Sequence, residues 1–245
     1  MARSIKRYLG YACAFFTTTV LVCGQSSAQE VPTYSGTIEF FVRGSGNFRN
    51  LTIFEEAGTS LTINLFNGRR SASYDYTGRL EYGLFRQTGL IDGVPQYVLA
   101  GKVTLSPSTA ETLILVIENP AFGVDPEATE FLLFSTADDL QSLPWDHIAF
   151  WNLTGAGLDG TLGDELFKLG DGLNDAQSIE PYLEDKSTMI GLSIRFSGRD
   201  RVLLQSRKRF YPNRRVLFVL LPPEDSDSLA VEVFRITEIN RELAE

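Results

Sequence analysis

Alternation of apolar and polar residues runs through nearly the whole chain, and it restricts the fold to β-strands. The runs 38–43, 61–66 and 190–197 are built in this way. Because successive side chains of a strand point to opposite faces, such a run covers a core with one face and meets water or a second layer with the other. The pattern predicts about fourteen short strands, at the spacing of a β-sandwich or barrel. Paired turn residues separate the runs, at Asn67-Gly68, Asp92-Gly93, Asp159-Gly160 and Ser197-Gly198.

Three runs are apolar at every position, 113–117, 131–134 and 216–221. We expect them to be central strands that are covered on both faces. Helix signals are scarce: a single turn is expected between Thr136 and Pro144, and a short terminal helix over residues 237–245. The chain lacks the alternation of strand and long helix that marks nucleotide-binding α/β domains. An all-β fold is therefore predicted.

The two halves of the chain show the same order of apolar and turn residues. Three pairs of segments match, 38–41 with 148–151, 61–69 with 192–199, and 76–79 with 211–214. Any two runs of strands match to some degree, so we expect either one antiparallel β-sandwich or two in tandem. In the tandem arrangement the first sandwich spans residues 29–122 and the second spans 123–245. Pro120, Gly123 and Pro126 break the strand pattern at this boundary.

Residues 1–28 have the order of parts of a secretory signal peptide. A basic start is followed by an apolar stretch over 8–22 and by the small residues Ser26 and Ala28. The stretch is shorter than the roughly 20 residues of a spanning helix. We expect cleavage after Ala28, export to the periplasm or beyond, and no transmembrane segment in the mature chain. Cys23 would permit a lipid anchor, although Val22 stands where a small residue is usual.

Composition narrows the possible partners. The chain has a formal net charge of −9, and without the three basic residues of the signal 19 Lys and Arg remain against 31 Asp and Glu, a net charge of about −12. Nucleic-acid binding depends on neutralising phosphates, so an acidic body argues against it. Both cysteines lie within residues 1–28, so the exported part has no disulfide.

One stretch resembles a known group of proteins. Residues 148–155 read Ile-Ala-Phe-Trp-Asn-Leu-Thr-Gly, a hairpin follows over 158–162, and Phe167-Lys-Leu-Gly170 stands where those proteins have a Leu-x-x-Gly turn. This pattern is similar to that of uncharacterised secreted immunoglobulin-like β-sandwich proteins of Gram-negative bacteria. Val216 to Pro223 and the last strand share the similarity more faintly. The resemblance implies an immunoglobulin-like sandwich in the periplasm or cell envelope, and it supplies no catalytic residue.

The chain offers few parts for recognisable catalysis. Its one histidine, His147, follows Asp146, and Ser135 and Ser142 are the serines near it in sequence. No Gly-x-Ser-x-Gly elbow surrounds any serine, so we expect His147 to be a strand-start residue bonded to the turn at Trp145. Zinc is unexpected with a single histidine and no thiolate. The sequence therefore indicates a protein without catalytic activity or cofactor.

Two other kinds of site stay open as alternatives. Clustered acids could bind calcium, but the EF-hand spacing fails. A glycoside hydrolase needs only two carboxylates across a cleft, and a carbohydrate-binding module needs exposed rings. The acids in question are Asp159, Asp164, Glu165, Asp171 and Asp175 with Asn174, and the rings are Tyr74, Tyr76, Trp145 and Tyr211.

A concentration of positive charge stands out against the acidic background. Eight basic residues lie between Arg195 and Arg215, and Asp200 is the single acid among them. Such a patch could bind phosphate or carboxylate groups of an envelope protein or of another anionic envelope component, such as lipid headgroups. Alternatively, its arginines pair with acids such as Glu224, Asp225 and Asp227. The candidate patch consists of Arg199, Arg201, Arg207, Lys208, Arg209 and Arg214. We thus expect an exported, non-catalytic binding or structural protein of the envelope.

Overall fold

The computed structural model describes residues 32–55, 58–183, 187–196, 199–223 and 231–240. The chain divides into two compact units, Met1–Val31 and Pro32–Glu245, and all described residues belong to the second. The expected signal peptide, Cys23 and the Ser197-Gly198 turn lie outside the described residues. Among the described residues, no helix is long and apolar enough to cross a membrane.

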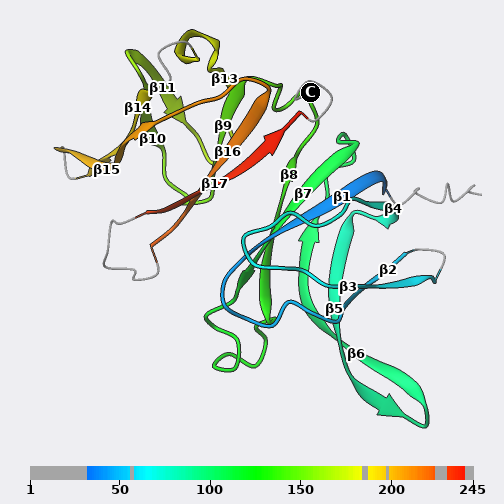
Figure 1. Cartoon of the computed structure of the whole chain (residues 1–245). Helices are drawn as coiled ribbons and strands as arrows, with labels where there is room; N and C mark the ends of the chain where they lie inside the picture. Colours follow the sequence, from blue (N-terminus) through cyan, green and yellow to red (C-terminus); the bar gives the residue numbers. More distant parts are fainter. Residues whose placement is uncertain (1–31, 56–57, 184–186, 197–198, 224–230, 241–245) are drawn as a thin grey trace, which may run out of the picture. The chain divides into compact units, whose positions relative to one another are not determined.

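The first half of the described chain forms two four-stranded sheets (Figure 1). One, the β1 sheet, has the order β4-β1-β7-β8, and the other, the β5 sheet, has the order β3-β2-β5-β6. In the β1 sheet, β1 and β7 are parallel and the other pairs are antiparallel. The strands are β1 (Thr33–Arg43), β2 (Leu51–Phe54), β3 (Ser60–Ile63), β4 (Tyr74–Arg79), β5 (Glu81–Ile91), β6 (Val94–Thr104), β7 (Glu111–Glu118) and β8 (Phe131–Ala137).

The second half forms two further sheets. The β9 sheet has the order β12-β9-β16-β17, with β13 also paired to β9, and the β14 sheet has the order β11-β10-β14-β15. A 3-10 helix (Glu180–Tyr182) precedes β14. The strands are β9 (His147–Asn152), β10 (Leu158–Leu162), β11 (Glu165–Leu169), β12 (Gly172–Leu173), β13 (Gln177–Ser178), β14 (Thr188–Phe196), β15 (Arg199–Lys208), β16 (Arg214–Leu221) and β17 (Glu232–Ile239).

The two halves repeat one topology. β1, β7 and β8 have the same neighbours and directions as β9, β16 and β17, including the parallel central pair. Likewise β2, β3, β5 and β6 correspond to β10, β11, β14 and β15. This correspondence supports an internal duplication of one sandwich.

The strand registers extend the correspondence to single residues. Phe41 pairs with Leu115 and Leu115 with Phe134; in the second half Trp151 pairs with Val219 and Val219 with Phe234. The predicted match of segment 38–41 with 148–151 thus joins equivalent strands. The other two predicted matches were wrong, because they join β3 to β14 and β4 to the loop before β16, which are not equivalent.

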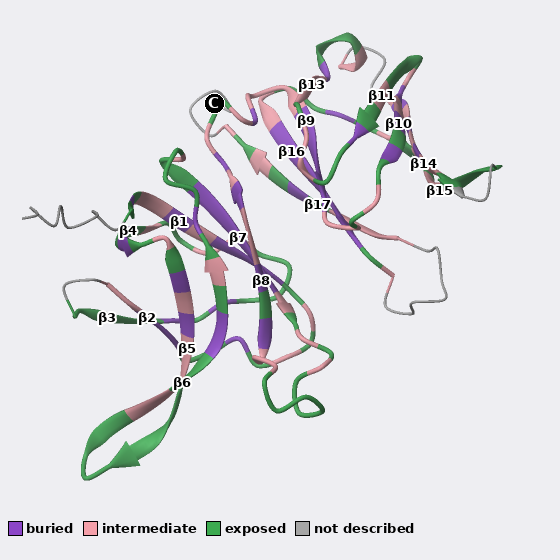
Figure 2. Ribbon diagram, turned by 180° about the vertical axis from the view of Figure 1, so that it is seen from behind, coloured by how far each residue is buried: buried purple, intermediate pink, exposed green. Residues whose placement is uncertain are grey.

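Each pair of sheets encloses its own apolar core. Between the β1 and β5 sheets lie side chains such as Phe40, Leu84 and Val116, and between the β9 and β14 sheets lie Phe150 and Phe218 with their neighbours. Figure 2 shows the buried residues along the strands of both pairs. The prediction of an all-β protein of the β-sandwich class is confirmed.

A third apolar cluster joins the two halves. It combines the second faces of the β1 and β9 sheets, with members such as Phe41, Leu115, Trp151 and Val219. The rings of Phe41 and Phe234 stack across it at 5.7 Å. Since β7 and β16 are therefore covered on both faces, the prediction of central strands at 113–117 and 216–221 is confirmed.

Some expectations were wrong in detail. Residues 131–134 belong to β8, an edge strand with one partner, because the β1 sheet ends there. Residues 237–239 belong to β17 rather than to a helix, and 241–245 lie outside the described residues. The expected boundary at 122–123 falls in the connection between β7 and β8, and the chain passes from one sheet pair to the other between Asp138 and Asp146. The strand order also differs from that of an immunoglobulin domain. Here β1 and β2 lie in different sheets, whereas the first two strands of an immunoglobulin domain lie in the same sheet.

Candidate functional site

The structure separates the predicted basic patch into two groups. Arg199 and Arg201 lie at the start of β15, beside the turn of the β14–β15 hairpin, and both are exposed. Arg207 and Lys208 lie at the end of the same strand, roughly 20 Å further along at about 3.3 Å per residue. Arg209 and Arg214 flank the short loop between β15 and β16. Only the second group gathers around one hollow.

This cationic hollow, as we call it, has a volume of about 480 Å³. Five basic residues line it, four of them predicted and one, Arg235 on β17, not predicted. No acidic residue of the described chain lines it. Its residues are Ile179, Arg207, Lys208, Arg209, Phe210, Tyr211, Arg214, Val216, Arg235, Thr237 and Ile239.

The cations of the hollow are not neutralised by described residues. None of the five forms an ion pair within the part of the chain that the structure describes. Arg214 instead lies over the ring of Tyr211, 4.6 Å from its centroid. Glu224, Asp225 and Asp227, which the sequence offered as partners, lie outside the described residues.

The hollow lies where the second sandwich differs from the first. In the first sandwich β6 packs against β8: a Cβ added at Gly101 would come within 3.0 Å of Leu133 and of the Phe131 carbonyl, and the Ser135 hydroxyl donates to the Thr104 carbonyl at 2.8 Å. The equivalent strands β15 and β17 do not pack along their lengths among the described residues. The hollow occupies one end of this open edge.

A second hollow lies beside the first at the junction of the two sandwiches. Its volume is about 800 Å³, and it shares Arg235, Thr237 and Ile239 with the cationic hollow. Glu39, Glu238 and Trp145 also line it. We call it the junction hollow. It differs from its neighbour because two of its arginines, Arg70 and Arg215, bind carboxylates.

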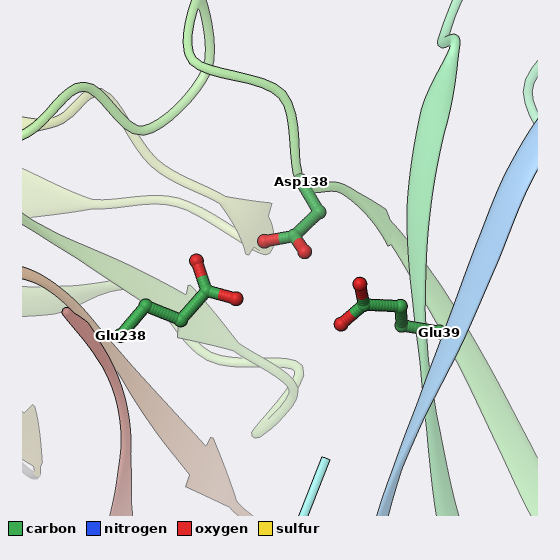
Figure 3. A group of neighbouring side chains, drawn as sticks. All are labelled: Glu39, Asp138 and Glu238. Atoms are coloured by element: carbon green, nitrogen blue, oxygen red, sulfur yellow. The ribbon is translucent and has the colours of Figure 1, made fainter. Parts of the chain in front are cut away.

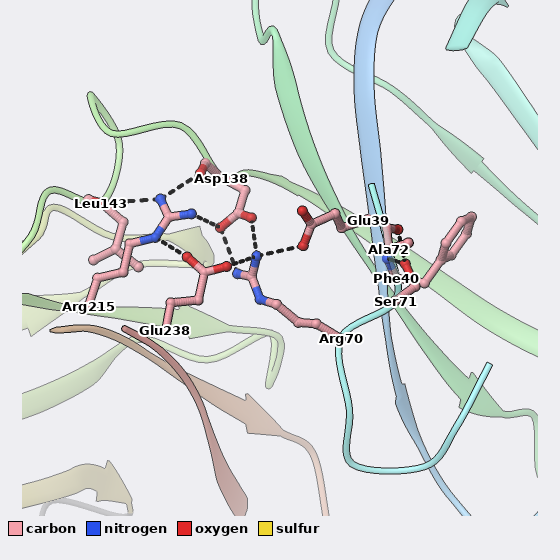
Figure 4. A network of polar contacts seen from close by, with 9 residues as sticks. All are labelled: Glu39, Phe40, Arg70, Ser71, Ala72, Asp138, Leu143, Arg215 and Glu238. Carbon is pink, nitrogen blue, oxygen red and sulfur yellow. Dashed lines mark hydrogen bonds and ion pairs between the residues drawn. The ribbon is translucent and has the colours of Figure 1, made fainter. Parts of the chain in front are cut away.

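Five charged residues form what we call the junction network: Glu39, Arg70, Asp138, Arg215 and Glu238. Arg70, from the loop between β3 and β4, is at its centre (Figure 4). Its guanidinium donates to Glu39 of β1 at 3.0 Å, and to both oxygens of Asp138 at 2.6 and 2.9 Å. It also forms an ion pair with Glu238 of β17 at 2.5 Å. Arg70 therefore connects the β1 sheet, the chain after β8 and the β9 sheet.

Arg215 of β16 completes the network from the other side. Its guanidinium donates to the backbone carbonyls of Asp138 at 2.7 Å and Leu143 at 3.4 Å, and to the carboxylate of Glu238. It also lies 5.4 Å from the centroid of the Trp145 ring. Arg215 was predicted within the basic run, yet its side chain is 8% exposed and is used to hold the junction.

Two of the carboxylates that meet here occupy equivalent positions in the two halves. The strand registers make Asp138 and Glu238 equivalent. Each follows the residue paired with an equivalent position of the central strand, Thr112 of β7 or Val216 of β16. With Glu39 they bring three carboxylates together, whose oxygens lie within 4.8 Å of one another (Figure 3). Such a group could hold a metal ion, but the guanidinium of Arg70 already contacts all three. The cation of this group is thus an arginine.

Burial and charge set the ionisation of the network. Burial works against the charged form of Arg70, but the hydrogen bonds and charge of Asp138, with the charges of Glu238 and Glu39, outweigh it and raise the pKa of Arg70. For Glu39, burial dominates and raises the pKa, while Arg70 opposes the shift. The network is held by ionised Arg70, whereas burial works against the charged form of Glu39.

His147 has a structural role. Its Nδ1 lies 2.7 Å from the carbonyl of Trp145, so Nδ1 carries the proton and donates to that turn, as expected. The carboxylate of Asp146 instead accepts a hydrogen bond from the backbone N–H of Asn213 at 2.6 Å. The described geometry therefore does not link Asp146 to His147 as a relay.

The remaining candidates are dispersed. The side chain of Asn174 closes its own loop by accepting from the Gly170 N–H at 2.7 Å and donating to nearby carbonyls. No three of the acids between 159 and 175 form a close group in the described chain. Of the rings, Tyr76 is buried and Tyr74 packs against the first core, while Trp145 and Tyr211 lie in different hollows.

Comparison with models of known protein families gives no match, and comparison with curated proteins gives none either. The resemblance to secreted immunoglobulin-like proteins stays a prediction. The chemistry of the hollows therefore carries the functional argument.

Proposed function

We propose that the protein is an exported, non-catalytic β-sandwich protein of the bacterial cell envelope that binds an anionic partner at the cationic hollow. The observation that carries the proposal is that five basic residues line one hollow and form no ion pair in the described chain. They come from β15, the loop after it, β16 and β17. In a chain with a net charge of −9, such a site selects for negative charge through complementarity.

The chemistry of the five side chains indicates the ligand groups. Guanidinium groups bind phosphate and carboxylate with paired hydrogen bonds, and four of the five cations are arginines. The hollow is open to solvent, so its contacts with an anion will weaken as salt is added. A phosphate or carboxylate group of a partner fits this site.

Titration calorimetry with inorganic pyrophosphate tests the proposal. The triple variant Arg207→Ser, Lys208→Ser, Arg209→Ser should bind at least about tenfold more weakly, since loss of about 1.4 kcal/mol is a tenfold change. The matched control is Arg199→Ser with Arg201→Ser, at the other end of β15, and it should bind as the unchanged protein does. Equal affinity of the triple variant and the control would exclude the hollow as the site.

Cell fractionation tests the envelope part of the proposal. The triple variant should leave the envelope fraction, whereas the control should stay in it. If both variants stay, the hollow does not mediate envelope association. A protein that still begins at Met1 after export would contradict cleavage after Ala28.

A glycoside hydrolase is the second candidate, because carboxylates do meet in a hollow. Glu39 and Glu238 line the junction hollow beside Trp145, and burial raises the pKa of Glu39, as for a general acid. The arrangement ranks second because Arg70 contacts both carboxylates, in the space that a scissile bond would need. Hydrolysis of aryl glycosides that Glu39→Gln abolishes would reverse this ranking.

A further inference from the structure

The hairpin of β5 and β6 extends beyond its sheet (Figures 1 and 2). β2 pairs with β5 only at Phe85 and Arg86. From residue 87 to 98 the two strands therefore pair only with each other among the described residues. A lone two-stranded ribbon is of marginal stability, so a ribbon of this length is suited to contact with a partner.

The tip of the ribbon is apolar on both faces. Leu90, Ile91 and Val94 are 63%, 61% and 59% exposed. Ile91 pairs with Val94 on one face, and Leu90 pairs with Pro95 on the other. A flat partner would cover only one of these faces. A tip of this kind therefore fits a partner that surrounds it.

The charge of the tip further restricts the class of partner that could bind it. Asp92 is the one charged residue between 87 and 99, and it forms the turn with Gly93 at φ values of 52° and 79°. In a bilayer the turn would enter first and would carry the carboxylate into hydrocarbon, which is unfavourable. A hollow with basic side chains and apolar walls suits the tip better.

The cationic hollow offers that combination. Two exposed side chains with apolar surface, Ile239 at 48% and Tyr211 at 46%, line it together with its five cations. Its volume of about 480 Å³ is large enough for the end of a turn and too small for a whole ribbon. We propose that the β5–β6 tip of one copy docks into the cationic hollow of a second copy, with Asp92 among the cations. This inference rests on the proposed function, because it names the anionic partner of the same hollow.

The arrangement has a consequence for assembly. The tip belongs to the first sandwich and the hollow to the second, so the contact is head-to-tail and joins unlike surfaces. A contact of this type extends from copy to copy unless the rotation between copies closes a ring. Sedimentation velocity should show species larger than a dimer as protein concentration rises.

Charge exchange tests the contact. Asp92→Lys, and separately Arg207→Glu with Arg209→Glu, should each weaken self-association about tenfold or more, since each replaces an attraction by a repulsion. A mixture of the two variants should associate, because each altered surface meets its complement. Asp92→Asn, which suits the turn, should weaken association without repulsion. Circular dichroism of each variant checks that the fold is kept.

The outcomes separate this inference from the proposed function. If pyrophosphate binds in the hollow but the protein is monomeric at all concentrations, self-docking is wrong and anion binding stands. If neither is seen, both are wrong. Association that survives both charge changes, or a mixture that stays monomeric, also overturns self-docking. Binding of the tip to phospholipid vesicles, lost in Ile91→Ser, would assign the tip to a membrane instead.

Discussion

The basic residues of the two neighbouring hollows differ in their exposure and in their partners. Arg70 and Arg215 in the junction hollow have side chains 14% and 8% exposed, and each binds carboxylates. The five cations of the cationic hollow are more exposed as a group and have no ion-pair partner in the described chain. A buried charge requires a partner, whereas an exposed charge is stabilised by water. Burial therefore distinguishes arginines that hold the fold from arginines that are free to bind a ligand.

The largest expected effect is at Asp138, whose side chain is 6% exposed. Asp138→Ala removes the carboxylate that binds Arg70 at two positions and leaves a buried cation under-compensated. We expect the free energy of unfolding to fall by about 3 kcal/mol in urea titrations.

Asp200→Ala is the matched control for that change. Asp200 is 73% exposed and lies 3.9 Å from Arg195, so its loss should change stability by less than about 1 kcal/mol. Equal losses for the two variants would break the distinction between buried and exposed arginine partners.

A smaller effect with a defined pH dependence is expected at Glu39. Burial raises the pKa of this carboxyl, so the folded state binds a proton more tightly than the unfolded state does. Ionised Glu39 therefore disfavours folding above its folded pKa, and this cost is relieved as pH falls through that pKa. Glu39→Gln should be at least as stable as the unchanged protein at neutral pH. Its free energy of unfolding should lack the gain that protonation of Glu39 gives the unchanged protein at acidic pH. Urea titrations across pH that show a clear loss at neutral pH would contradict this assignment.

The smallest effect is expected in the cationic hollow. Arg209 is exposed and has no ion pair with a described residue, so Arg209→Ser should change the free energy of unfolding by less than about 0.5 kcal/mol. Pyrophosphate affinity should fall in the same variant. A stability loss as large as that of Asp138→Ala would show that the exposed arginines also hold the fold.

Strand patterning was sufficient to predict the class of fold but not the pairing. The fully apolar runs at 113–117 and 216–221 lie in strands that pair on both sides, and they are apolar at every position because the other half of the molecule covers their second face. The run at 131–134 has similar composition but lies at an edge, and composition alone does not distinguish the two positions. The repeat was predicted in outline, and it was misaligned after its first segment because β-strands without distinctive residues match in many registers.

The candidate site was predicted where its residues are neighbours in sequence. Arg207, Lys208 and Arg209 gave a visible run, and Arg235 was missed because only the pairing of β16 with β17 brings it near. The junction network combines Glu39, Arg70, Asp138, Arg215 and Glu238, which are far apart in the chain. An isolated arginine in a loop, such as Arg70, gives no sequence signal that it will be buried between carboxylates.

The contact between the β1 and β9 sheets has a consequence for symmetry. These sheets are equivalent, and they meet through equivalent side chains, Phe41 with Leu115 on one and Trp151 with Val219 on the other. Identical subunits related by a twofold axis meet in this way. The two halves thus meet as the subunits of such a dimer would, and they differ at the outer edge, which is closed in the first half and open beside the positively charged hollow in the second.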